Sequence, residues 1–66
     1  MKTFWERVDE AKADFINEES ELLLSMYGDY ARDMERYHGE SKDLYESAHV
    51  NYTAIRRILL DRLEVK

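Results

Sequence analysis

The chain has 66 residues, no cysteine, no proline and two glycines, and its 15 acidic and 10 basic side chains give a formal net charge of −5. A chain of this length forms one domain with a small core, since a domain of about 60 residues buries only about 60% of its unfolded surface. Without cysteine there is neither a disulfide framework nor a thiolate zinc site, so we expect a partner chain to contribute to stability.

The apolar runs are too short for a membrane span. No apolar run exceeds three residues, the length of Leu22 to Leu24, which falls far short of the roughly 20 residues that a membrane helix needs. Acidic residues follow Lys2 too closely for a secretory signal, so we expect a cytoplasmic protein with no membrane partner. A short chain that begins with Met is also typical of phage and mobile-element proteins.

The first predicted element is a long helix over about residues 3–38. With no proline and little glycine, few residues interrupt a helix, and at 100° per residue the apolar side chains from Phe4 to Tyr37 lie in one arc of roughly 160°. Thr3 and Glu6 have the spacing of a capping box at its start, and Gly39 is the residue type that ends a helix.

A second helix is predicted over about residues 41–65, with Ser41 as its N-cap. The connection at 38–40 is short, so the two helices are expected to be antiparallel neighbours. This pairing brings Tyr27 near Tyr52 and Leu23 near Ile55. The predicted fold is therefore an all-α helical hairpin, a single domain over residues 1–66, that dimerises into a bundle.

An alternative is a compact three-helix bundle with a turn near 17–20 and helices over about 3–16, 18–37 and 41–65. Asn17 to Glu21 contains no apolar residue, and Asn17 followed by two glutamates resembles a helix start. The unbroken apolar phase and the absence of glycine and proline from this stretch favour the continuous helix. A break at Gly28 also stays open.

The continuous helix would leave its beginning uncovered. The second helix is shorter, so residues 1–13 would extend about 20 Å beyond it at 1.5 Å per residue. Phe4, Trp5 and Val8 would then be exposed, and exposed aromatic clusters mark interfaces. We therefore predict an interface at these three residues and a homodimer or higher oligomer.

Charged residues give two further candidate features. Residues 1–40 carry eleven acidic and five basic groups, a net of −6, with one ridge of carboxylates at i+3 and i+4 spacing: Glu6, Glu10, Asp14, Glu18 and Glu21. This ridge is either a solvated surface or an anionic docking site for a basic partner. Glu19 and Arg62 would meet in the hairpin as a partly buried ion pair that sets the helix register.

The sequence gives little support for catalysis or for metal or cofactor binding. The most specific pattern is a repeated Glu-x-x-His, at Glu35–His38 and Glu46–His49, which ligates metals when it points into a bundle. Both pairs fall opposite the apolar arcs, so we predict surface residues and keep metal binding as a lesser alternative. No thiol nucleophile or glycine-rich phosphate loop is present. We predict no catalytic, cofactor or metal site.

The basic residues of the second helix point in different directions, which makes nucleic acid an unlikely partner. The leading functional hypothesis is a non-enzymatic protein that binds and inhibits a larger protein or nucleic-acid enzyme. The alternative is a structural protein whose self-association is its function.

Overall fold

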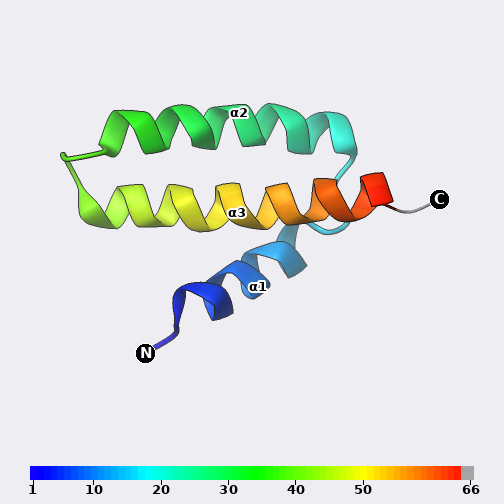
Figure 1. Ribbon diagram of the computed structural model, residues 1–66, viewed down its shortest axis with the longest axis horizontal. Coiled ribbons are helices and arrows are strands. Elements are labelled where there is room, and N and C mark those ends of the chain that lie inside the picture. Colours follow the sequence, from blue (N-terminus) through cyan, green and yellow to red (C-terminus); the bar gives the residue numbers. More distant parts are fainter. Residues whose placement is uncertain (65–66) are drawn as a thin grey trace.

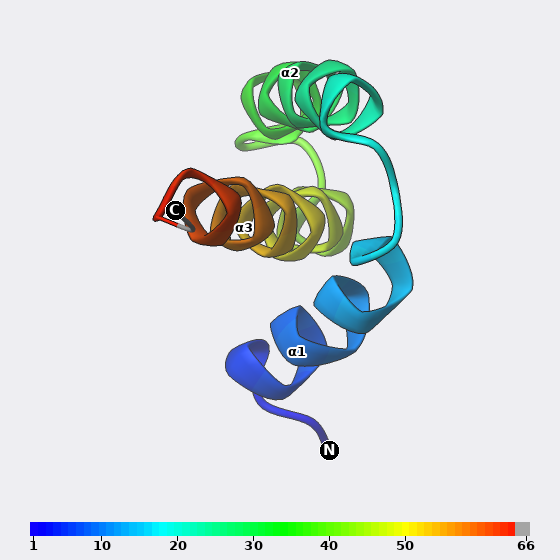
Figure 2. The same cartoon turned by 90° about the vertical axis from the view of Figure 1, so that its right-hand side faces the viewer.

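The computed structural model describes residues 1–64, which form three helices: α1 (Phe4–Phe15), α2 (Ser20–Tyr37) and α3 (Lys42–Glu64). α2 and α3 run side by side in opposite directions, and α1 crosses the other side of α3 at an angle (Figure 1). The end-on view shows α3 between α2 and α1 (Figure 2). The predicted continuous helix over 3–38 is therefore wrong, and the three-helix alternative is confirmed.

The break between α1 and α2 lies at residues 16–19. The amide of Glu18 donates to the Phe15 carbonyl at 3.0 Å, which closes a turn after α1. Glu19 then adopts extended backbone angles as the N-cap residue of α2. No apolar side chain between Asn17 and Ser20 holds this stretch in a helix, and the break lets α1 fold back onto α3. Burial of α1 against α3 outweighs the few helical hydrogen bonds lost.

The predicted helix starts are confirmed. At Thr3 the hydroxyl accepts from the Glu6 amide at 3.2 Å and the Glu6 carboxylate accepts from the Thr3 amide at 3.0 Å, so the capping box is complete. The Ser41 hydroxyl accepts from the Leu44 amide at 3.2 Å at the start of α3. The predicted end of this helix, at residue 65, lies outside the described residues.

The glycines have different positions. α2 continues through Gly28 without a break. Gly39 has a φ of +83° in the turn between α2 and α3, as expected of the residue that ends the helix.

The core consists of two hydrophobic clusters on two sides of α3. Between α1 and α3 the buried residues are Val8, Ala11, Val50 and Ala54. Between α2 and α3 they are Leu23, Ile55 and Ile58, with Tyr27 packed against them. Phe15, the last residue of α1, packs against both clusters. The predicted neighbours Leu23 and Ile55 do lie together.

None of the helices in residues 1–64 is long and apolar enough to cross a membrane.

Candidate functional site

Five aromatic rings form a continuous series of contacts from the beginning of α1, along α3, to the α2–α3 turn. Phe4 contacts Trp5 edge-on, with ring centroids 5.1 Å apart, and contacts His49 at 4.9 Å. His49 contacts Tyr45 at 5.9 Å, and Tyr45 contacts His38 at 5.7 Å. We call these five residues the aromatic row. Each ring is half-buried or exposed, so the row forms part of the surface.

Trp5 is the most prominent member of the row. Its side chain is 54% exposed, although tryptophan is a costly residue to leave in water. The guanidinium carbon of Arg57 lies 4.6 Å from the Trp5 ring centroid, a cation–π contact from α3. Phe4 supports the ring from within α1. The indole is thus held in one orientation while a large part of it faces solvent.

Two ion pairs connect α1, the helix that carries Trp5 and Phe4, to α3. Arg7 donates to the Glu46 carboxylate at 2.9 Å, and Lys12 donates to the Asp61 carboxylate at 3.1 Å. All four side chains are about one-third exposed or more. Each such pair contributes about 0–1 kcal/mol. The buried cluster of Val8, Ala11, Val50 and Ala54 is therefore the main connection between α1 and α3, and the ion pairs add to it.

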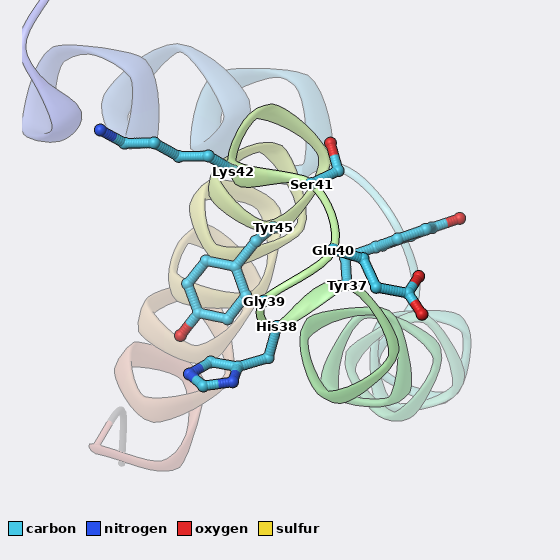
Figure 3. Close-up of a pocket in the computed structure, with 7 residues that line it drawn as sticks. All are labelled: Tyr37, His38, Gly39, Glu40, Ser41, Lys42 and Tyr45. Carbon is cyan, nitrogen blue, oxygen red and sulfur yellow. The ribbon is translucent and has the colours of Figure 1, made fainter.

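The turn end of the row borders a hollow of about 360 Å³ (Figure 3). Tyr45 and His38 lie together on one side of the turn, whereas Tyr37 and Glu40 point to the other side and Lys42 extends away (Figure 3). The polar groups around this hollow do not converge on one point.

A second surface feature is an apolar groove of about 310 Å³ between the beginning of α2 and the end of α3. We call it the leucine groove; its lining residues are Ser20, Leu24, Leu59, Arg62 and Leu63. Leu24 is 57% exposed and Leu63 is 80% exposed, so the groove presents apolar surface to solvent.

The predicted interface at Phe4, Trp5 and Val8 is only partly exposed. Val8 is fully buried between α1 and α3, which corrects the expectation that it lies uncovered. Because the chain turns at residues 16–19, α1 folds back onto α3 and does not extend beyond the end of the hairpin. Phe4 is half-buried, and Trp5 keeps its exposure.

The predicted acidic ridge is divided by the same break. Glu6, Glu10 and Asp14 lie on α1, Glu18 lies in the α1–α2 link and Glu21 begins α2, so they do not form one helix face. All five are exposed. Glu10 forms an ion pair with Lys2. The hydrogen bond from the Thr3 backbone amide is the main cause that lowers the pKa of Glu6 below its usual 4.5. A hydrogen bond with the Thr3 side chain has a smaller effect in the same direction.

The predicted Glu19–Arg62 ion pair does not form. Arg62 donates to the carbonyls of Ile16 and Glu18, at 3.0 and 2.7 Å, and to the Ser20 hydroxyl at 2.8 Å. Arg62 therefore binds the α1–α2 link to α3 through backbone acceptors, and Glu19 is exposed at the N-cap position. An arginine with five donors suits carbonyls that no helix hydrogen bond satisfies.

Glu46 and His49 of the second Glu-x-x-His pair have different partners, and His38 of the first pair contacts Tyr45. Glu46 accepts from Arg7, while His49 packs between Phe4 and Tyr45. Within residues 1–64, no group of three or more histidine, aspartate or glutamate side chains could hold a metal ion.

Tyr27 and Tyr52 form a close pair in the middle of the α2–α3 hairpin. Their rings are stacked, with centroids 4.4 Å apart and planes at 16°, and their hydroxyl oxygens share a hydrogen bond of 2.7 Å. This hydrogen bond is the main cause that raises the pKa of Tyr52 above its usual 10.0, and burial raises it further. The sequence predicted that the two residues lie near each other, and the structure confirms this.

Sequence reasoning missed the aromatic row as a unit. Tyr45 and His49 are four residues apart on one helix, which is a visible signal for one contact of the row. The contact of Phe4 with His49, and of Trp5 with Arg57, depends on how α1 crosses α3. No local pattern encodes that crossing.

Comparison of the chain with protein-family models, curated proteins and solved structures found no match.

Proposed function

We propose that this chain is a non-enzymatic cytoplasmic protein that binds a larger protein and inhibits it, with the aromatic row as its binding surface. The observation that carries the proposal is Trp5, half exposed and held between Phe4 and Arg57. Tryptophan, tyrosine and arginine are the residue types that dominate binding energy at protein interfaces.

Preorganisation supports this proposal. A side chain that is already fixed loses little rotamer freedom on binding, so more of its contact energy appears as affinity. Trp5 contacts two neighbours, Phe4 and Arg57, and the buried cluster between α1 and α3 holds the helix that carries it. The partner that fits such a surface has an apolar pocket for the indole ring.

The negative charge of the chain indicates the class of partner that would complement it. The net charge is −5, and α1 carries the exposed carboxylates of Glu6, Glu10 and Asp14 along its length. A partner with basic groups around its apolar pocket complements this surface, and an enzyme that acts on nucleic acid has such groups at its substrate site.

The test begins with affinity capture of a stoichiometric partner from the host, followed by binding measurements with that purified partner. Trp5→Ala is expected to weaken binding by about 2 kcal/mol or more, which is a factor of about 30. Leu22→Ala is the matched control, because Leu22 is 47% exposed on α2, outside the aromatic row.

Two outcomes would contradict the proposal. Equal affinity of Trp5→Ala and the unaltered chain would exclude the aromatic row as the binding surface. If the captured partner kept its full activity when saturated with the chain, inhibition would be wrong.

Self-association through the leucine groove is the second candidate function. Val8 is covered by α3 and needs no second chain, but Leu63 at 80% exposure and Leu24 at 57% are uncovered. A second copy of the chain could bury both sets of leucines across a two-fold axis. In sedimentation, a species heavier than 8.0 kDa that Leu63→Ser returns to monomer supports this function. A monomer at high concentration rejects it.

A further inference from the structure

The Tyr27–Tyr52 pair has a geometry that neither candidate function uses. The two rings are nearly parallel, at 16°, and the phenolic ends are brought to an oxygen–oxygen distance of 2.7 Å. The ring carbons ortho to each hydroxyl are one bond from the hydroxyl-bearing carbon. The stacking and the shared hydrogen bond therefore bring the phenolic edges of the two rings together, and these edges carry the ortho carbons.

The pair also differs from the remaining tyrosines. Among the ring contacts of residues 1–64, this stack is the one between two tyrosines, whereas Tyr45 has histidine neighbours. Tyr27 and Tyr52 come from different helices, and Tyr27 also packs against the cluster of Leu23, Ile55 and Ile58. Both are half-buried, so they remain partly accessible to a reagent in solution.

We propose that Tyr27 and Tyr52 form an oxidative cross-linking site, at which a one-electron oxidant converts the pair into an intramolecular dityrosine that locks α2 to α3.

The reaction balances with the oxidant as electron acceptor. Each phenol loses one electron to the oxidant and one proton to water, which leaves two phenoxyl radicals. The radicals couple through one ortho carbon of each ring, so one carbon–carbon bond forms. The hydrogen on each coupled carbon is then lost to solvent as the oxygen regains a proton, which restores both phenols. The net change is the loss of two hydrogen atoms from the chain.

The fold favours this product over links between chains. Coupling within one molecule needs no encounter, because the two rings are already in contact. The dityrosine bond would join the middle of α2 to the middle of α3, so residues 28–51 would form a covalently closed loop. Such a covalent closure restricts the unfolded chain, as a disulfide does, so the melting midpoint of the product rises.

The experiment treats the folded chain with a haem peroxidase and limiting hydrogen peroxide. The expected product shows dityrosine fluorescence, lacks two hydrogen atoms in its intact mass, and migrates as a monomer on a denaturing gel. Its yield per chain does not depend on protein concentration and falls in denaturant. In the product obtained from the unaltered chain, peptide mapping is expected to find the peptides that contain Tyr27 and Tyr52 cross-linked to each other. Methionine oxidation is distinguished because it adds oxygen.

Variants with a single tyrosine replaced by phenylalanine test which tyrosines form the product. Tyr27→Phe and Tyr52→Phe abolish the intramolecular product, whereas Tyr30→Phe and Tyr37→Phe, which alter other tyrosines of α2, retain it. An unchanged yield in Tyr27→Phe, a peptide map that joins other tyrosines, or products that are mainly dimers and increase with concentration would each overturn the proposal. The peptide map tests it even if a phenylalanine variant does not fold.

Discussion

Gly28 in the middle of α2 and Gly39 in the α2–α3 turn differ in what they require of the backbone. Gly28 is helical, and a Cβ added there meets nothing within 4 Å. Gly39 has the same open space but a φ of +83°, which side chains with a Cβ rarely adopt. The two positions therefore respond to the same substitution in opposite directions.

We predict that Gly28→Ala stabilises the protein by about 0.5–1 kcal/mol, because alanine loses less backbone freedom than glycine in a helix. Gly39→Ala is the control and is expected to destabilise it by about 1 kcal/mol or more, through strain in the turn. Urea unfolding of both variants measures the change. A destabilising Gly28→Ala would mean that another group packs at this position.

Glu6 makes the stability of α1 depend on pH. Its lowered pKa means that the folded state prefers the carboxylate, since Thr3 donates to it. The resulting stabilisation is present above the usual pKa of 4.5 and is lost as the pH falls through the lowered pKa.

Glu6→Gln is therefore expected to reduce the loss of stability in acid, because glutamine can still accept from Thr3 but does not titrate. The measurement is urea unfolding at a series of pH values from neutral to below 4.5. Asp14→Asn, at the other end of α1, is the matched control. An acid profile of Glu6→Gln identical to that of the unaltered chain would contradict the assignment.

Arg62 is the main polar connection between α3 and the link that joins α1 to α2. Its guanidinium donates to two carbonyls of the link and to Ser20 at the start of α2. Hydrogen bonds from a charged donor are stronger than neutral ones, although exposure to water reduces their contribution here. Arg62 thus helps to set where α1 ends and α2 begins.

We expect Arg62→Ala to cost about 1–2 kcal/mol and to increase amide hydrogen exchange in residues 16–21. Arg62→Lys should recover only part of this loss, because an ammonium group cannot span the acceptors as a guanidinium does. Arg56→Ala, also on α3, should change stability by less than about 0.5 kcal/mol. Normal exchange in the link of Arg62→Ala would show that the turn forms without this residue.

At the level of the whole molecule, stability depends on two clusters that share few residues. Val8 and Val50 belong to one and Leu23 and Ile55 to the other, with α3 contributing to both. Phe15 packs against both clusters, so it couples the docking of α1 to the α2–α3 hairpin. The hairpin retains its own cluster if α1 separates.

Phe15→Ala is predicted to destabilise the protein by about 3 kcal/mol, at the lower end for phenylalanine because Phe15 is half-buried. It should also let α1 open before the hairpin unfolds, which hydrogen exchange resolves as weaker protection in α1 than in α3. Phe15→Leu, which keeps apolar volume at the same place, should restore most of the coupling. Uniform loss of protection in all three helices would show that Phe15 does not couple them.

The sequence contained enough information for the helical class, both capped helix starts and the turn at Gly39. These depend on residues within four positions of each other, such as Thr3 with Glu6 and Ser41 with Leu44. The register of α2 on α3 also followed from the short turn, which is why the Tyr27–Tyr52 contact could be predicted.

The path of α1 could not be read from local signals. Residues 16–19 contain no glycine or proline, and the apolar phase continues across them, so both a continuous and a broken helix suit the local pattern. The difference lies in contacts between residues far apart in sequence: Val8 with the α3 cluster, and Arg62 with the link. Those contacts determine that Val8 is buried, that the acidic ridge is divided and that Trp5 meets Arg57. Helix caps are short-range interactions, whereas burial of α1 is a property of the assembled chain.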